Sequence, residues 1–234
     1  MNSPLLLSLK LALVTSCLLL ALGLPVAYWL AFTRLRLRFL IESLVALPIV
    51  LPPTVMGFYL LVAFGSRGAL GAAWQRYTGH TLAFSFEGLV LGSVLYSWPF
   101  AVQPFTAALA AVDRRLLAAS ASLGASPWRT FWRIAFPLAL PGIVGGFALS
   151  FAHTLGEFGV VLMLGGNIAG RTRTASIAIY DDVQMLDYAS AARQSLLLLG
   201  ISFALLVAIH ALNRERSFTP ASQDQAWWGP RRLR

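Results

Sequence analysis

Five stretches of the chain are apolar enough to cross a lipid bilayer, and they constrain its fold more than any other feature. A membrane-spanning helix needs about 20 predominantly apolar residues. Because the bilayer core offers no water to the backbone, runs of this length must fold as packed helices. We therefore expect an all-α integral membrane bundle of five transmembrane helices, with a sixth, re-entrant or interfacial segment within 165–195 as the alternative. The expected spans are 5–32, 39–64, 88–112, 138–164 and 196–212, the last beginning nearer residue 191.

The composition agrees with a membrane protein. Of the 234 residues, 58% are hydrophobic and 12% are charged, whereas soluble domains carry about 25% charged residues. A net charge of +9 would also suit a nucleic-acid-binding protein, but such a protein would not combine its basic residues with apolar runs of this length. We therefore expect no nucleic-acid partner. Cys17 is the only cysteine, which excludes an intrachain disulfide and a cysteine-based metal cluster.

The basic residues are distributed unevenly between the two sides of the predicted bundle. Twelve of the 18 fall in the connection between spans one and two, the connection between spans three and four, and the C-terminal tail. Because cytoplasmic loops are enriched in Lys and Arg, the N-terminus is expected outside and the C-terminus in the cytoplasm. We treat 1–213 as one transmembrane domain and expect the polar, proline-containing tail 214–234 to be poorly ordered.

Polar and helix-breaking residues interrupt the predicted spans. Prolines survive in a bilayer where neighbouring helices or a water-filled cavity satisfy the freed backbone groups, so those of spans two and three either line a path or kink packed helices. Polar residues inside spans are likewise either pathway-lining groups or interhelical hydrogen-bonding groups. The candidates for a pathway or gate in this set are Thr54, Ser93, Ser97, Gln103 and Ser150.

The connection 113–137 is too regular to be a loose loop. Residues 116–123 favour helix, Gly124 suits a helix C-cap, and Ser126 with Pro127 suits the start of a second helix. In that helix Trp128, Phe131 and Trp132 form an apolar stripe, and we expect Pro137 and Pro141 to end it. Such a stripe can lie in the lipid interface, pack on its own bundle, or dock into a groove of a partner protein.

The same connection resembles the EAA loop of ABC-importer permeases, which is the chain's most specific motif. Gly124, Ile134, Pro137, Pro141 and Gly142 match the pattern, whereas its opening acidic residue is absent because 117–119 read Leu-Ala-Ala. In that family the short helix of the loop couples the membrane helices to a cytoplasmic ATPase. The resemblance therefore implies a coupling role for Gly124, Ala125, Ser126, Pro127, Trp128, Arg129, Phe131 and Trp132.

Further stretches are similar to permeases of the molybdate branch, within the sulfate/molybdate/tungstate group. They are LPIVLPPTVMGFYLL (47–61), FGSRGALG (64–71), AHTLGEFG (152–159) and GNIAGRTRT (166–174), and the similarity extends over 5–213. It implies a homodimeric, bacterial inner-membrane subunit that works by alternating access with an ATPase dimer and an external oxyanion-binding protein. ATP and Mg²⁺ would bind to the ATPase, and no cofactor to this chain. Sulfate, thiosulfate and tungstate are the alternative substrates.

Charged residues near the outer side complete the candidate set. His153 and Glu157 are four residues apart and are expected on one helix face, where Glu157 either pairs with His153, caps a neighbouring helix, or acts in gating. Arg171 and Arg173 either guide an anion or meet a binding protein, or are solvated. Asp181, Asp182 and Asp187 fit a solvated helix face, and we assign no metal to them.

Two other classes of membrane protein fit the sequence less well. A lipid-phosphate enzyme needs clustered catalytic groups, but the three histidines are scattered along the chain. An ion-coupled secondary transporter needs an intramembrane carboxylate pair or an inverted repeat, and Glu157 is the only carboxylate available. The sequence also has no phosphate-binding G-x-x-x-x-G-K-[ST] motif, so we expect a transport subunit rather than an enzyme.

Overall fold

The computed structural model describes residues 3–214, and within them all regular secondary structure is helical. The all-α prediction is therefore confirmed, whereas the tail predicted to be poorly ordered lies, from residue 215 on, outside the described residues. The helices are α1 (Pro4–Phe32), α2 (Arg38–Val50), α3 (Pro53–Phe64), α4 (Ala69–Thr78), α5 (Phe86–Ala110), α6 (Arg114–Ser122), α7 (Pro127–Thr130), a π-helical turn (Phe131–Ala135), α8 (Phe136–Leu155), α9 (Gly159–Gly165), α10 (Ala175–Gln184) and α11 (Tyr188–Arg214).

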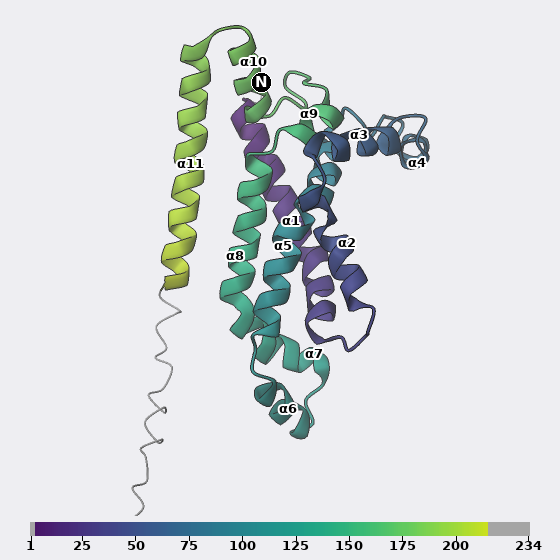
Figure 1. The fold of residues 1–234 in the computed structure, drawn as a ribbon, viewed down its shortest axis with the longest axis vertical. Helices are drawn as coiled ribbons and strands as arrows, with labels where there is room; N and C mark the ends of the chain where they lie inside the picture. Colours follow the sequence, from purple (N-terminus) through teal and green to yellow (C-terminus); the bar gives the residue numbers. More distant parts are fainter. Residues whose placement is uncertain (1–2, 215–234) are drawn as a thin grey trace, which may run out of the picture.

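Helices α1, α5 and α8 form the centre of the bundle (Figure 1). Phe105 and Leu109 of α5 are fully buried among them. Small residues let the helices approach closely, as is usual in membranes. A Cβ on Gly146 of α8 would lie only 2.7 Å from the Phe105 ring, and one on Gly142 would lie 2.5 Å from the Ala108 Cβ. The glycines of α8 therefore set its distance from α5.

The predicted second span, 39–64, is wrong as a single helix. It breaks after Val50 into α2 and α3, whose axes differ by 107°. Two successive prolines, Pro52 and Pro53, cause the break, because a residue before proline is driven out of the helical region and proline has no N–H to donate. Leu51 is extended accordingly (ψ 131°). Helix α3 then lies across the end of the bundle and packs on α9 (Figure 1).

The predicted fourth span, 138–164, is displaced at both ends. At its start, α7, the π-helical turn and α8 form one continuous helix, Pro127–Leu155. Pro137 does not end the helix. It lies in the first turn of α8, directly after the π turn, where the wider backbone hydrogen-bond pattern tolerates the N–H that proline lacks. Pro141 is accommodated inside the helix. At its other end, the helix stops at Leu155 and the chain re-forms a short helix, α9.

Helix α11 stands at the side of the bundle, where it packs chiefly on α10 and α8 (Figure 1). It begins at Tyr188, earlier than the predicted 191–196. Among the described residues, α1, Pro127–Leu155 and Tyr188–Ala208 are long and apolar enough to cross a membrane, and the bent α2–α3 pair counts as a fourth candidate. Helix α5, with 25 residues, runs beside α1 and α8.

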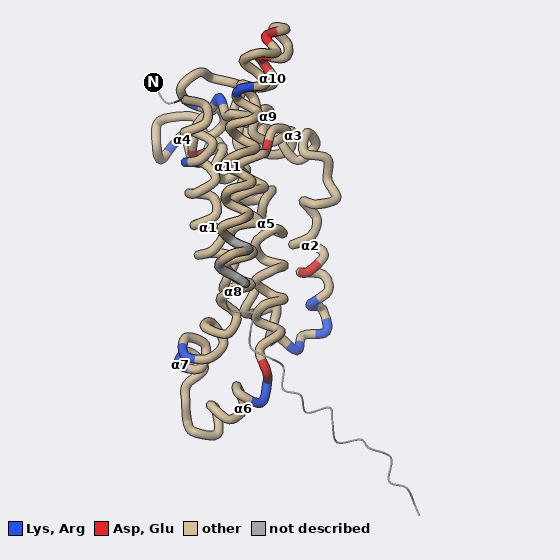
Figure 2. Tube along the Cα trace, turned by 90° about the vertical axis from the view of Figure 1, so that its left-hand side faces the viewer, with Lys and Arg blue, Asp and Glu red and all other residues tan. Residues whose placement is uncertain are grey.

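The basic residues of the connections gather at one end of the bundle. Figure 2 shows Lys and Arg along the α1–α2 connection, at the start of α6 and on α7, with α10 and its acidic residues at the opposite end. We call the end that holds α6 and α7 the basic end, and the other the opposite end. The connection between spans one and two and the connection between spans three and four thus lie at the same end, as the charge pattern predicts.

Candidate functional site

The connection between α5 and α8 folds as helix, glycine turn and helix, as predicted. The Asp113 carboxylate accepts from the Arg115 N–H (2.8 Å) and caps α6, and the Ser126 hydroxyl accepts from the Arg129 N–H (3.3 Å) and caps α7. Gly124 has φ +77°, the left-handed conformation that ends helices and favours glycine. The hydroxyls of Ser120 and Thr130, 2.9 Å apart, join the two helices.

The aromatic stripe of this connection does not project freely. Phe131 is half-buried and meets the Tyr28 ring of α1 edge-on, with centroids 5.1 Å apart. Trp128 and Trp132 pack on each other (5.5 Å) and remain 71% and 45% exposed. Phe131 therefore packs partly on its own bundle, whereas the two tryptophans remain exposed, and the docking role of the stripe stays a prediction.

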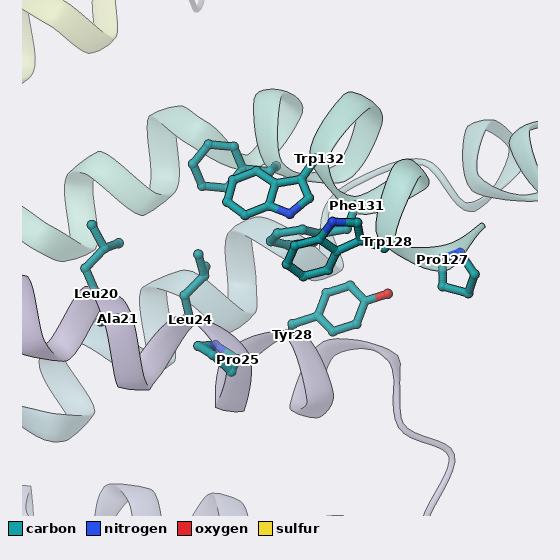
Figure 3. Close-up of a pocket in the computed structure, with 10 residues that line it drawn as sticks. Leu20, Ala21, Leu24, Pro25, Tyr28, Pro127, Trp128, Phe131 and Trp132 are labelled. Carbon is teal, nitrogen blue, oxygen red and sulfur yellow. The ribbon is translucent and has the colours of Figure 1, made fainter. Parts of the chain in front are cut away.

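An apolar groove of about 560 Å³ separates the stripe from α1 (Figure 3). We call it the stripe groove. It lies at the basic end, because Tyr28 is one turn from the end of α1 and Pro127 begins α7. The groove is lined by Leu20, Ala21, Leu24, Pro25, Tyr28, Pro127, Trp128, Phe131, Trp132 and Phe136.

Beyond the groove, the turn between α6 and α7 forms the tip of the basic end (Figure 1). Leu123 in this turn is 88% exposed, and a Cβ on Gly124 would meet nothing within 4 Å. Of the predicted coupling residues, Gly124, Ala125 and Ser126 form this tip, whereas Pro127, Trp128, Phe131 and Trp132 line the groove. Arg129 is exposed.

Four of the predicted pathway or gate residues come together between α5 and the end of α8. The Ser97 hydroxyl lies 2.9 Å from both His153 Nδ1 and Thr154 Oγ1, and the His153 ring stacks on Phe100 (3.8 Å). The Ser93 hydroxyl donates to Glu157 Oε2 (3.2 Å). We call this group, Ser93, Ser97, His153, Thr154 and Glu157, the polar cluster.

Glu157 does not share a helix face with His153, contrary to the prediction. Helix α8 stops at Leu155, so Glu157 lies in the turn before α9. Its side chain bonds to Ser93, and its carbonyl accepts from the Ser176 hydroxyl (2.5 Å). Glu157 is 6% exposed, and its second carboxyl oxygen, Oε1, is buried and has no hydrogen-bond partner among residues 3–214. Thr154 and Ser176 were not predicted, because single Thr and Ser residues next to a span carry no distinguishing pattern.

Arg173 is held by an ion pair and is not a free guide for anions. Its guanidinium bonds to the Asp181 carboxylate of α10, which also accepts from the Asn167 amide (2.9 Å). Burial raises the pKa of Asp181, but the hydrogen bonds from Arg173 and Asn167 outweigh burial and hold the pKa below its usual value. Arg171 is exposed. The two arginines of the motif therefore differ in environment.

The acidic residues of the opposite end have structural contacts rather than a plainly solvated face. Asp181 binds Arg173, Asp182 accepts from the Gln194 amide (2.6 Å), and Asp187 caps α11 through the Ser190 N–H (3.0 Å). Within residues 3–214, no group of three His, Cys, Asp or Glu side chains is placed to hold a metal ion.

The remaining predicted polar residues lie apart from the polar cluster. The Ser150 hydroxyl bonds to the Phe147 carbonyl (2.8 Å) and approaches Ser16 of α1 (3.5 Å), and Thr54 is exposed at the start of α3. Gln103 is exposed and lines a groove of about 570 Å³ between α2 and α5. Sequence reasoning missed its neighbours Arg38, Glu42 and Thr106, although the i, i+4 ion pair of the first two (2.6 Å) was a readable signal.

Comparison with known proteins places these features in a family. Residues 22–214 match the family described as "Binding-protein-dependent transport system inner membrane component". The chain is 49% identical over 208 residues to the molybdenum transport system permease protein ModB of Azotobacter vinelandii, covering 89% of this chain and 92% of that protein. It is 39% identical over 215 residues to ModB of Escherichia coli (strain K12), covering 88% and 94%.

A solved structure shows the same fold. The MetNI methionine ABC transporter, in an inward-facing conformation, contains a chain that superposes with a TM-score of 0.72, covering 90% of this chain and 93% of that one, at 18% identity. At this identity the likeness shows the fold alone.

Proposed function

The chain belongs to the family of binding-protein-dependent transport system inner membrane components, and on this premise we propose that it is the membrane-spanning subunit of an ATP-driven molybdate importer. The observation that supports molybdate as the substrate is the 49% identity to a molybdenum permease over nearly the whole of both chains. Tungstate and sulfate remain the alternatives, because all are tetrahedral oxyanions.

The subunit acts as a homodimer with a cytoplasmic ATPase dimer and an external binding protein. The family description supports the binding protein. The lack of a nucleotide-binding motif in the chain supports a separate ATPase, which binds ATP and Mg²⁺, and this chain carries no cofactor of its own. The basic end faces the cytoplasm and the N-terminus lies outside, which the gathering of arginines at that end supports.

The ATPase contacts the tip between α6 and α7. The tip projects beyond the bundle, and its Leu123 is exposed. Its shape is fixed by the left-handed Gly124 after α6 and by the Ser126 cap of α7. Because Pro127–Leu155 is one continuous helix, movement of the tip is passed to α8, which packs on α5 and α1. The opening acidic residue of the EAA pattern is not needed for this geometry.

The transport path runs along the side of α5 that carries Gln103. This side is open to the α2–α5 groove, where the Gln103 amide offers hydrogen-bond donors to an anion. Of its neighbours in the groove, Arg38 is paired with Glu42, and the Thr106 hydroxyl donates to the Val102 carbonyl. The polar cluster, in contrast, is buried between α5 and α8, and its side chains bond to one another. We therefore assign to the polar cluster the role of joining α5 and α8 near the opposite end, rather than contact with the anion.

Uptake by the reconstituted complex tests this function. With the ATPase, the binding protein and ATP present, vesicles containing this chain should accumulate molybdate, and omitting any one component should abolish uptake. Competition by tungstate and sulfate then ranks the substrates. Uptake by this chain alone without nucleotide would contradict an ATP-driven importer, and sulfate outcompeting molybdate would contradict the substrate.

A further inference from the structure

The stripe groove has features that coupling to the ATPase does not require. Its walls are apolar, and Figure 3 shows Trp128, Phe131 and Trp132 on one side facing Leu24, Pro25 and Tyr28 on the other. A volume of about 560 Å³ is within the range of about 300–1,000 Å³ found for small-molecule sites.

Polar groups in the groove are unpaired. Among the described residues, neither the Tyr28 hydroxyl nor the indole N–H groups of Trp128 and Trp132 have a hydrogen-bond partner. Tyr and Trp place an apolar ring beside a polar tip, which suits the boundary between acyl chains and headgroups. The groove opens where the spans reach the basic end, which is where such a boundary would lie.

The helical segment that forms one wall of the groove also carries two arginines. Arg129 directly follows Trp128 and Arg133 directly follows Trp132, and both arginines are exposed. In the described part of the chain the ion pairs are Arg38–Glu42 and Arg173–Asp181, so neither of these arginines is neutralised by a carboxylate. The two guanidinium groups belong to the helical wall of the groove but not to its lining, and they are complementary to the phosphate of a lipid whose acyl chain occupies the groove.

We propose that the stripe groove binds an anionic phospholipid, with one acyl chain between α1 and the aromatic stripe and the phosphate at Arg129 and Arg133. This goes beyond the proposed function, and it requires only that the basic end lies at a membrane surface. The bound lipid would connect α1 to the start of the continuous helix Pro127–Leu155.

Quenching of tryptophan fluorescence by brominated lipids tests the proposal on the full chain in vesicles, without the ATPase. Brominated phosphatidylglycerol should quench more strongly than brominated phosphatidylcholine at equal content, and Trp132→Phe should remove much of this difference. The double variant Arg129→Gln/Arg133→Gln should lower the preference for phosphatidylglycerol by about fivefold per arginine. The matched control Arg34→Gln/Arg36→Gln removes the same charge from exposed arginines of the same end and should keep the preference.

A second variant keeps the proposal testable if the arginine variant fails to fold. Ala21→Phe fills the groove without changing charge, because Ala21 is exposed and lines it. This change should reduce the part of the quenching that depends on Trp132, and it should do so for both lipids. Equal quenching by the two lipids in the wild-type chain would overturn the proposal. If neither lipid quenched Trp132, the proposal would also be overturned, since a protein surface, such as a second copy of this chain, would then cover the groove.

Discussion

At the scale of single residues, contacts decide which of two similar side chains is available for function. Arg171 and Arg173 are equivalent in the sequence RTRT, but Arg173 is paired with Asp181 and Arg171 is exposed. The partner of Arg173 lies in α10, eight residues further along the chain, and no short-range sequence pattern predicts the pair. Sequence reasoning therefore selected this segment as a candidate but could not distinguish its two arginines.

The Arg173–Asp181 pair should make the opposite end sensitive to acid. Because the folded-state pKa of Asp181 lies below the ordinary value of an aspartate, about 3.9, the pair contributes its full stability above about pH 4. That stability is lost as the pH falls through the lower, folded-state pKa. Replacing Asp181 with Asn should cost about 1–3 kcal/mol of unfolding free energy at pH 7. The difference from wild type should shrink as the medium is acidified below pH 4.

Thermal unfolding at several pH values in detergent measures this effect. Asp182→Asn is the matched control, because Asp182 accepts from the neutral Gln194 amide rather than from an arginine. A difference between wild type and Asp181→Asn that stays constant down to pH 2 would show that the carboxylate charge contributes nothing.

At the scale of elements, local sequence signals predicted where helices begin and end, whereas the long-range packing of those helices could not be predicted. The caps at Gly124 and Ser126 depend on residues within one helical turn, so the helix–turn–helix was readable. The position of the stripe against Tyr28 depends on how α1 packs, which the sequence of the loop does not contain. Pro52 and Pro53 were correctly seen as helix breakers, but the 107° angle between α2 and α3 follows from the packing of α3 on α9.

Gly124 gives the sharpest test of the tip between α6 and α7. Val at this position should cost about 1–2 kcal/mol, because its β-branched side chain resists the left-handed backbone of φ +77°. A cost of this size shifts the population of the correctly shaped tip roughly tenfold. ATP hydrolysis should therefore be uncoupled from uptake, while the subunit remains inserted in the membrane.

Measuring ATPase rate and molybdate uptake on the same vesicles separates the two effects. Asn tolerates the left-handed region, and the site has open space around a Cβ, so Gly124→Asn should behave close to wild type. Unchanged uptake in Gly124→Val would show that the turn geometry has no part in coupling.

At the scale of the whole molecule, hydropathy and charge were sufficient for the class of fold and for the end at which the arginines gather. They were insufficient for the number and limits of the spans. Apolar residues flank the breaks at Leu51 and Gly156 on both sides, so averaged hydropathy joins segments that the backbone separates. The resemblance to ABC-importer permeases added the coupling role of the loop and the expected class of substrate, neither of which follows from composition.

The proposed orientation predicts opposite labelling of two exposed positions. In a Cys17→Ser background, Leu123→Cys should react with a membrane-impermeant maleimide only after the membrane is opened, because the tip is cytoplasmic. Arg171→Cys should react in intact spheroplasts, because the opposite end is outside. Both positions are exposed in the structure. The reverse pattern would invert the orientation, and the unmodified Cys17→Ser chain sets the background.

The peripheral place of α11 has a consequence for biosynthesis. Transmembrane helices insert individually and associate afterwards, and chains are made from the N-terminus. The central helices α1, α5 and α8 are complete once the ribosome has passed Leu155, whereas α11 begins only at Tyr188 and packs chiefly on α10 and α8. The centre of the bundle can therefore assemble while the last helix is still being translated, and α11 joins a structure that already exists.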